Sequence, residues 1–342
     1  MIHMKIDVSL FFPCDLFFTL VLFRRNGGIT HMDLRTRILA RTTIRSIAGT
    51  LSTAALLFSG IGFSGCKENS VGSTDQEMAA GVAAAALIDH RTTTLSEIPE
   101  SYIRKAKREL RIAYGHTSHG SQIITGMTGL VPFKGSLYSF NNTGADSALT
   151  LHDTPFASAA DLGNPDRTAW AAATRSYLLA HPEVNVVIWS WCGQVSTATP
   201  ADIDTYLALM DSLERAFPAV SFVYMTGHLD GTGLEGNLHK RNQQIRSYCA
   251  THNKRLFDFA DIETWTPDGL YMGDKKPNDN CDYDSNGDGT LDRNWATEWQ
   301  NTHPDQWYQC SSAHSQPLNA NRKAYAAWWL WARLAGWNGI SN

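Results

Sequence analysis

The chain has 342 residues, of which 43% are hydrophobic and 18% are charged, and its formal net charge at pH 7 is -4. This composition is that of a globular protein, and the length allows one large domain or two modest ones. The slightly negative charge argues against a nucleic-acid partner, because such a partner would require a basic surface.

The N-terminal part of the chain has the features of an export signal. A basic patch that begins at Met32 is followed by an apolar run over residues 48–63 and then by Ser-Gly-Cys66. A basic start, an apolar centre and small residues before a break are typical of secretory signals. The cysteine after Ser-Gly resembles a bacterial lipobox, in which that cysteine is lipidated; a plain signal peptide or a short membrane anchor is the alternative. We expect a bacterial envelope lipoprotein, held to the membrane only by a lipid on Cys66, or a secreted protein.

Composition divides the chain into three segments. Residues 1–66 are the N-terminal extension with the signal, residues 67–98 are rich in Ala, Ser and Thr and are predicted to be a linker, and residues 99–342 are predicted to form the folded domain. The first 66 residues hold 7 of the 29 Lys and Arg and 3 of the 33 Asp and Glu, so the remainder has a net charge near -8. The remainder of the chain is thus more negatively charged than the whole, which strengthens the argument against a nucleic-acid partner.

Buried strands alternate with amphipathic helices along the predicted domain. The strands are expected around Ile112 and over residues 148–152, 185–190, 221–226 and 255–259, and the helices over residues 101–109, 167–179, 203–217, 237–252 and 320–334. Strands that are apolar on both faces are typical of a parallel sheet covered on both sides. The pattern predicts a doubly wound, mostly parallel α/β sheet with helices on both faces, a flavodoxin-like three-layer sandwich.

A polar turn follows the first predicted strand and contains reactive residue types. It includes His116, Ser118 and His119 between two glycines. A sharp turn after a strand can hold a serine hydroxyl clear of the sheet while nearby backbone N–H groups face an oxyanion. A polar loop whose histidines only cap or solvate it is the alternative. The turn therefore predicts a serine nucleophile if the rest of the chain supplies partners.

Two further polar residues follow predicted strands in the same way as Ser118. Gln194 comes after the strand at 185–190, and His228 comes after the strand at 221–226. Ligands of open α/β sheets bind at the carboxyl ends of the strands. We therefore expect Ser118, Gln194 and His228 to line one pocket, together with His116 and His119.

An acidic segment precedes the last predicted helix, within an insertion of about residues 264–309. Its alternating oxygen side chains and its glycine suit a calcium loop whose predicted ligands are Asp284, Asn286, Asp288, Thr290 and Asp292. The twelfth position of this register is Trp295 rather than a bidentate carboxylate, so Glu298 is a candidate to close the site. A solvated acidic turn is the alternative. We predict a structural calcium ion here and no organic cofactor.

Export also affects how the cysteines are interpreted. Cys192, Cys249, Cys281 and Cys310 would lie in an oxidising compartment and could form two disulfides in any of three pairings. We favour a bond between Cys281 and Cys310, because it would close the insertion.

The serine turn near the start of the domain and a histidine near its end form a recognisable pair. Ser118 follows the first strand, and His314 lies just before the last helix. Over roughly residues 110–336 the chain resembles the SGNH (GDSL-type) hydrolases, and most closely those whose first block reads His-x-Ser-x-Gly, here His116, Ser118 and Gly120. The resemblance implies Ser118 as the nucleophile and His314 as the base that takes its proton.

The last block departs from the family pattern. It is usually Asp-x-x-His, but Ser311 stands three residues before His314. The carboxylate that would orient the imidazole is therefore missing from its usual place. Asp305, a backbone carbonyl, or a Ser-His dyad without an acid are the alternatives.

The resemblance also implies donors for an oxyanion. These are the backbone N–H of Ser118, the N–H of a second-block glycine and the amide of Gln194, which stands near the family's asparagine. Gly163 is the preferred second-block glycine, and Gly144 is the alternative. Such donors stabilise the tetrahedral intermediate of acyl transfer.

Three functions are consistent with these features. The leading one is an exported serine esterase that acts on a small ester or removes an acetyl group from a polysaccharide. The first alternative is a metal-dependent hydrolase with zinc held by His116, His119 and His228, and with His314 as a further candidate ligand. The second alternative is a non-catalytic surface protein that binds carbohydrate on the same fold, a possibility raised by Ser311.

Overall fold

The computed structural model describes residues 86–340. The predicted signal, Cys66 and most of the predicted linker lie outside the described residues. Within the described range, no helix combines the length and hydrophobicity that a membrane span requires.

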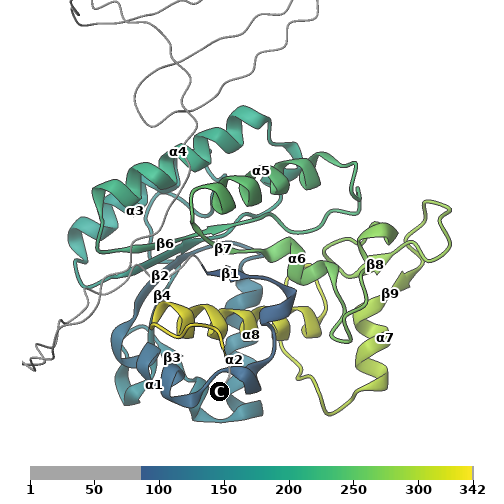
Figure 1. Cartoon of the computed structure of the whole chain (residues 1–342), viewed down its shortest axis with the longest axis horizontal. Helices are drawn as coiled ribbons and strands as arrows, with labels where there is room; N and C mark the ends of the chain where they lie inside the picture. The colour runs from purple at the N-terminus through teal and green to yellow at the C-terminus, as the bar shows by residue number, and fades with distance from the viewer. Residues whose placement is uncertain (1–85, 341–342) are drawn as a thin grey trace, which may run out of the picture. The chain divides into compact units, whose positions relative to one another are not determined.

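Seven strands form the central sheet (Figure 1). In their order across the sheet they are β1 (Leu87–Ile88), β7 (Arg255–Phe257), β6 (Ser221–Met225), β5 (Val186–Trp189), β2 (Arg111–Gly115), β4 (Leu149–Asp153) and β3 (Phe140–Asn141). Every pair of neighbouring strands in this sheet is parallel. The predicted α/β fold with a parallel sheet is confirmed.

The strand order reverses between β2 and β5. Without the two-residue edge strands β1 and β3, the sheet runs β4-β2-β5-β6-β7, which is the order of flavodoxin-like sheets. The register pairs Gly115 at the end of β2 with Trp189 at the end of β5. The residues that follow these two strands therefore leave the sheet side by side, at the point where such folds bind ligands.

Four helices contribute to the hydrophobic core on one face of the sheet. They are α1 (Glu100–Glu109), α2 (Ser121–Lys134), α6 (Phe259–Thr264) and α8 (Pro317–Leu334). Helix α8 is central to this layer, and Trp328 and Trp331 on it are almost completely buried. The tryptophans of the last helix are therefore core residues, as their mixture with Ala and Leu predicts.

Helices α3 (Ala169–Ala180), α4 (Pro200–Ala216) and α5 (Asn237–Thr251) cover the opposite face, above the sheet in Figure 1. Their core includes Trp170 and Tyr206, which pack near Trp189 and Trp191 of the β5 segment. Helix α4 begins with a capping box between Thr199 and Asp202, which satisfies N–H groups that the first turn of a helix leaves free. The sheet is thus covered on both faces.

The fold begins earlier than predicted. Strand β1 lies in the segment assigned to the linker and pairs with β7 through Leu87 and Ile88. Ile88 and Ile98 are buried in the core. The linker boundary at residue 98 is therefore wrong, because a two-residue strand has too little periodicity to be recognised in the sequence.

The insertion before α8 has its own small core. It contains the antiparallel pair β8 (Asp282–Tyr283) and β9 (Arg293–Asn294) and helix α7 (Trp295–Thr302), at the right of Figure 1. Met272, Cys281, Tyr283, Trp295 and Trp299 pack together inside it with Leu318 of α8. Apolar packing of this kind stabilises the insertion without a covalent link.

The predicted disulfides are wrong for this structure. Cys192, Cys249, Cys281 and Cys310 are all free. Cys281 Sγ lies 3.7 Å from the Ser315 hydroxyl instead. Because the insertion already has a hydrophobic cluster, it needs no disulfide to close it.

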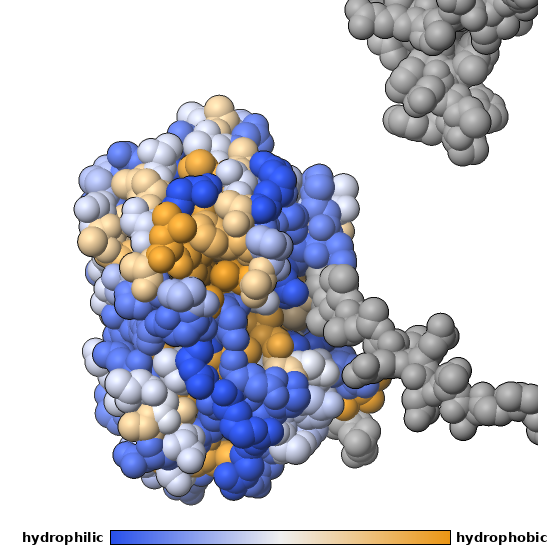
Figure 2. Space-filling model, turned by 90° about the vertical axis from the view of Figure 1, so that its left-hand side faces the viewer, coloured by the Kyte–Doolittle hydropathy of each residue, from blue (hydrophilic) through white to orange (hydrophobic). Residues whose placement is uncertain are grey.

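The side of the molecule shown in Figure 2 is mixed in character. Hydrophobic atoms are exposed in the upper part of that view, and hydrophilic atoms predominate below. Over the described residues, the large exposed hydrophobic side chains come from separate segments, among them Leu87, Leu179, Leu234, Leu270, Leu291 and Ile340. Single exposed apolar residues of this kind are ordinary on a soluble surface.

Candidate active site

The turn after β2 is fixed tightly against the β5 segment. A Cβ at Gly120 would lie 2.0 Å from the Ser190 hydroxyl, so only glycine fits at this close approach. The Tyr114 hydroxyl donates to the Gly120 carbonyl at 2.9 Å. Ser118, in the middle of this turn, is half-buried, and helix α2 begins three residues later. The turn thus holds Ser118 at the carboxyl edge of the sheet.

His119 contacts two polar side chains from distant parts of the chain. Its Nε2 lies 2.9 Å from Asp279 Oδ2, in the insertion, and its Nδ1 lies 3.4 Å from Cys192 Sγ, just after β5. Only 6% of the surface of His119 is exposed. The ring is therefore held in place through both of its nitrogens.

Two more histidine rings stack on His119. The His228 ring is parallel to it, at an interplanar angle of 3° and a centroid distance of 3.5 Å, and the His314 ring lies at 20° and 4.5 Å. The three rings come from the segments after β2, after β6 and before α8. The convergence expected at the carboxyl edge occurs for His119 and His228, and it includes His314.

Burial and hydrogen bonding shift the pKa values of His119 and of the two side chains that it contacts. Burial alone would lower the pKa of His119, but its hydrogen bonds to Asp279 and Cys192 outweigh this and raise the pKa to about 9. The hydrogen bond from His119 lowers the pKa of Cys192 to about 7, against the opposing effect of burial. Burial would raise the pKa of Asp279, but the hydrogen bond to His119 and the nearby histidines lower it. His119 is thus a cation between two anionic groups near neutral pH.

The surroundings of His228 favour its neutral form. Burial is the main cause that lowers its pKa. Its Nδ1 lies 2.7 Å from the Leu229 carbonyl oxygen, which assigns the proton to Nδ1. Its Nε2 is buried and has no hydrogen-bond partner among the described residues.

A buried ion pair holds the three histidine segments together. Lys323 Nζ on α8 lies 2.5 Å from Glu263 Oε1 on α6, and both side chains are completely buried. The other Glu263 oxygen accepts the N–H of Leu229, next to the second histidine of the stack. Lys323 also donates to Gln122 on α2, whose amide donates to the carbonyl oxygen of Ala313, next to the third. One ion pair therefore ties α2, the segment after β6 and the segment before α8.

The Ser118–His314 relay is incomplete in this structure. His314 is exposed and has a φ of 60°, which is uncommon for a residue with a Cβ. Within residues 86–340, neither the Ser118 hydroxyl nor the His314 ring forms a hydrogen bond with another residue. Asp305, the candidate substitute acid, lines a separate cavity with Trp299 and Arg322. Ser118 and His314 therefore lie at the same edge of the sheet but are not hydrogen-bonded to each other.

Two of the three predicted oxyanion donors, Gly163 and Gln194, point to one carboxylate. The Gly163 N–H and the Gln194 amide donate to the same oxygen of Asp161, at 2.9 and 3.0 Å, and Thr117 donates to the other oxygen at 2.6 Å. Asp161 is almost fully buried, so this cluster fixes the connection before α3 against both turns. Gly144, the alternative donor, lies instead against Thr150 near the start of β4.

His116 lies apart from the histidine stack. Its Nε2 is 2.7 Å from Asp153 Oδ1 at the end of β4, and its ring packs on Tyr114. Its contacts are those of a structural residue that supports the turn. The structure therefore does not include His116 in the cluster proposed for zinc.

His119, His228 and Asp279 offer ligand atoms that lie within 4.8 Å of one another. By residue type this set would suit zinc. However, the lone pairs lie in the ring planes, so the parallel rings of His119 and His228 direct them within two separate parallel planes, and one ion cannot lie in both. The Nε2 of His119 also already faces Asp279. The arrangement is that of a hydrogen-bonded relay.

The predicted calcium ligands lie in one compact loop. Asp284, the only buried one, accepts the N–H groups of Gly287 and Gly289 at 2.7 and 2.8 Å. Asp292 bonds to Ser285. Glu298, the candidate closing ligand, pairs with Arg293 at 2.6 Å and also accepts from Tyr283. The donor types fit a calcium ion, while the closing carboxylate already has other partners.

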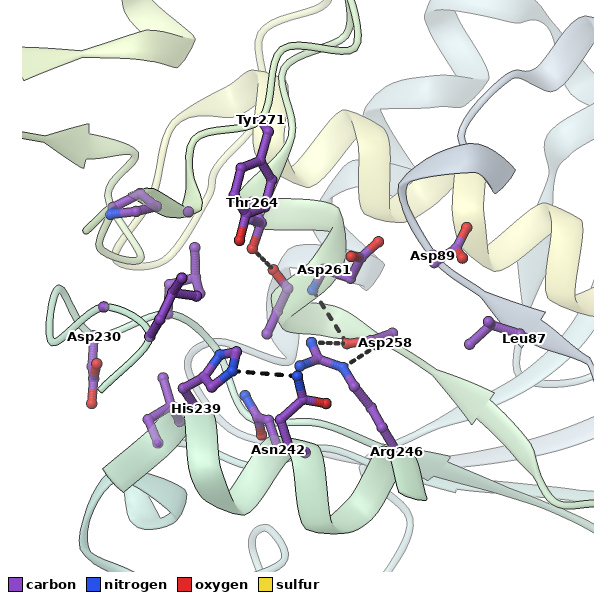
Figure 3. A pocket seen from close by; sticks show the side chains of 18 residues that line it. Leu87, Asp89, Asp230, His239, Asn242, Arg246, Asp258, Asp261, Thr264 and Tyr271 are labelled. Carbon is purple, nitrogen blue, oxygen red and sulfur yellow. Dashed lines mark hydrogen bonds and ion pairs between the residues drawn. The ribbon is translucent and has the colours of Figure 1, made fainter. Parts of the chain in front are cut away.

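A cavity of about 310 Å³ lies beside this edge but contains none of the predicted catalytic residues. Figure 3 shows Arg246 of α5 directed at Asp258, with Asp261 and Tyr271 nearby. Asp258, which was expected in the strand at 255–259, instead caps α6 and forms a two-pronged ion pair with Arg246 at 2.6 and 2.8 Å. This ion pair joins two of the charged groups of the cavity, which Asp89, Asp230 and Asp261 also line.

In comparisons with known proteins, neither a family model nor a curated protein sequence matched the chain. The resemblance to the SGNH hydrolases therefore rests on the motif residues alone.

Proposed function

We propose that the protein is an exported esterase of the SGNH type that uses Ser118 as its nucleophile and His314 as its general base. One observation carries the proposal. The ring of His314, from the far end of the domain, stacks at 4.5 Å on His119, the residue that follows Ser118. Two groups predicted to work together are thus at one edge of the sheet, where α/β enzymes bind their ligands.

In the reaction, the Ser118 hydroxyl attacks the ester carbonyl and His314 takes its proton. A hydroxyl is a poor nucleophile until an imidazole lies within hydrogen-bond reach. The exposed position of His314 and its positive φ are consistent with a side chain that closes on the serine when substrate is present. Gly163 and Gln194 already converge on one anionic oxygen, that of Asp161. Either donor would have to leave Asp161 to serve the developing oxyanion in the reaction.

The substrate class follows from the sequence rather than from the site. The predicted export signal, the predicted lipidation at Cys66 and the acidic composition suit an ester on a small molecule or on an envelope polysaccharide. An acetyl group is the simplest acyl group that such an enzyme would remove. The membrane would be contacted only through the lipid. A calcium ion at Asp284 and its neighbours would have a structural role, stiffening the insertion.

Ser118→Ala tests the proposal. We expect kcat/KM for a small acetyl ester to fall by about 10⁴–10⁶-fold, with an unchanged thermal midpoint, and labelling by a fluorophosphonate probe to be lost. Full activity in this variant would show that Ser118 is not the nucleophile. Activity abolished by a chelator and restored by zinc would favour the metal-dependent alternative. Wild-type protein that binds polysaccharide but neither hydrolyses esters nor reacts with the probe would favour the binding protein.

A further inference from the structure

The residue after β5 presents a thiol at the same edge as Ser118. Cys192 is half-buried. Its neighbour Gly193 is exposed, and a Cβ added there would meet no atom within 4 Å. The backbone next to Cys192 is therefore open on the side of Gly193, and the cysteine itself is partly exposed. The turn after β2 closes the other side, through His119.

Cys192 has the complete relay that Ser118 lacks. Cys192 Sγ lies 3.4 Å from His119 Nδ1, and His119 Nε2 lies 2.9 Å from Asp279 Oδ2. A nucleophile, a base and a carboxylate that orients the base, in this order, form the arrangement of nucleophilic acyl transfer. We propose that Cys192, His119 and Asp279 form a thiolate triad, and that Cys192 accepts acyl groups as a thioester. This proposal rests on the proposed function, because the substrates are the same esters and Cys192 lies at the same edge of the sheet as Ser118.

The charges that face His119 favour the thiolate. Asp279 from the insertion and Glu263 from α6 raise the pKa of His119, while His228 and His314 stack on its ring. With the pKa of His119 at about 9 and that of Cys192 at about 7, the thiolate–imidazolium pair predominates between these two values. The charge of Lys323 is compensated by its contact with Glu263.

The other described thiols provide internal controls. Burial raises the pKa of Cys249 and of Cys281 to about 12 and that of Cys310 to about 11. Cys310 is half-buried like Cys192, so exposure alone does not distinguish them. The difference is the histidine that hydrogen-bonds to Cys192.

The reaction balances without any further reagent. The Cys192 thiolate adds to the ester carbonyl, forming the C–S bond. As the C–O bond breaks, the alcohol leaves with the proton of the His119 imidazolium, and a thioester and a neutral imidazole remain. Water then attacks the thioester, His119 takes its proton, the acid leaves and the thiolate is restored. The net reaction is hydrolysis of an ester to an acid and an alcohol.

The test is to locate the acyl group. The full chain, as wild type and as the Ser118→Ala, Cys192→Ala and Cys310→Ala variants, is incubated with p-nitrophenyl acetate and quenched in acid. Acetylated peptides are then mapped before and after neutral hydroxylamine, which cleaves thioesters and spares oxygen esters. We expect a hydroxylamine-sensitive acetyl group on the Cys192 peptide in the wild type, in Ser118→Ala and in Cys310→Ala, and its absence in Cys192→Ala.

The outcomes separate the two proposals. Acetyl on Ser118 alone, with none on Cys192 in any variant, overturns the thiolate triad and leaves the serine esterase intact. A Cys192 thioester with full hydrolytic activity in Ser118→Ala supports the triad and overturns the serine as nucleophile. Acetyl on neither residue, with no hydrolysis, contradicts both. As a second readout, iodoacetamide should alkylate Cys192 with a pH midpoint near 7, whereas a midpoint near 9 or above contradicts the triad.

Discussion

The turns after β2 and β5 leave the sheet side by side, yet each offers its nucleophile a different environment. Ser118 has the position that a family motif predicts, but among the described residues its hydroxyl has no hydrogen bond and its expected base has no carboxylate. Cys192 is joined through His119 to Asp279 by contacts of 3.4 and 2.9 Å. The base of the second nucleophile therefore comes from the turn that presents the first. A motif can point to one edge of a sheet without showing which of the nucleophiles there has a complete relay.

The largest expected effect comes from the ion pair that supports the three segments of the histidine stack. Lys323→Met would leave Glu263 charged and buried without its partner, which typically costs about 3–5 kcal/mol. We expect unfolding at lower denaturant, together with loss of Ser118 labelling and a rise of the Cys192 alkylation midpoint towards the ordinary thiol value at low denaturant concentrations. The matched double variant Lys323→Met/Glu263→Leu should recover part of the stability, because it removes the stranded charge. A single variant as stable as wild type would show that the pair does not support the site.

The second prediction separates the two nucleophiles through their shared histidine. His119→Gln removes the cation that stabilises the Cys192 thiolate, so the alkylation midpoint should rise from about 7 towards the ordinary thiol value of 9.0. At pH 7 the thiolate fraction then falls about 50-fold, which the greater nucleophilicity of a more basic thiolate reduces to a net loss of about sixfold. Peptide-resolved alkylation across pH measures this, with Cys310 as the control thiol. If the alkylation midpoint of Cys192 does not change, His119 is not the cause of its lowered pKa.

A smaller effect is expected from the carboxylate. Asp279→Asn keeps the shape of the side chain and removes its charge, so the pKa of His119 should fall from about 9 by about 1–2 pH units. The alkylation midpoint of Cys192 should rise by less, because His119 still faces the thiol. Carbon-detected NMR titration of the His119 ring measures the first shift. If the pKa of His119 does not change, Asp279 does not orient it.

The smallest effect concerns the calcium loop. The insertion that carries Asp279 also carries Asp284, so calcium would tighten the relay of Cys192 and leave Ser118 untouched. At about five times Kd, one calcium ion should stabilise the fold by ~1 kcal/mol, seen as a higher thermal midpoint that EDTA removes. Asp284→Asn should abolish the response. A thermal midpoint that does not respond to calcium in the wild-type protein would identify the loop as a solvated acidic turn.

The sheet and the longer helices could be predicted because their apolar periodicity is local. The edge strands β1 and β3 could not, since two residues carry no period. The convergence of His119 and His228 followed from the rule for strand ends. Asp279 was missed because it lies in an irregular insertion and reaches His119 only through tertiary packing. Cys192 was interpreted as half of a disulfide, although its place directly after a buried strand was the same signal that pointed to Gln194.

Buried polar partners were the hardest to predict. Lys323 lies in an aromatic, Ala-rich helix and meets Glu263 sixty residues away in the sequence. Asp161 stands beside the predicted Gly163 but was not recognised as the acceptor of its N–H. In both cases the residue type is visible in the sequence, while the partner depends on how the layers pack.

The most direct test of the account is the rate of acetyl-ester hydrolysis by Ser118→Ala/Cys192→Ala, compared with Ser118→Ala/Cys310→Ala. If the carboxyl edge of β2 and β5 is the active site and carries two nucleophiles, the first double variant should hydrolyse the ester no faster than buffer. The second should keep the residual rate of Ser118→Ala. A wild-type rate in the first double variant, with the protein folded, would contradict the assignment of this edge as the active site.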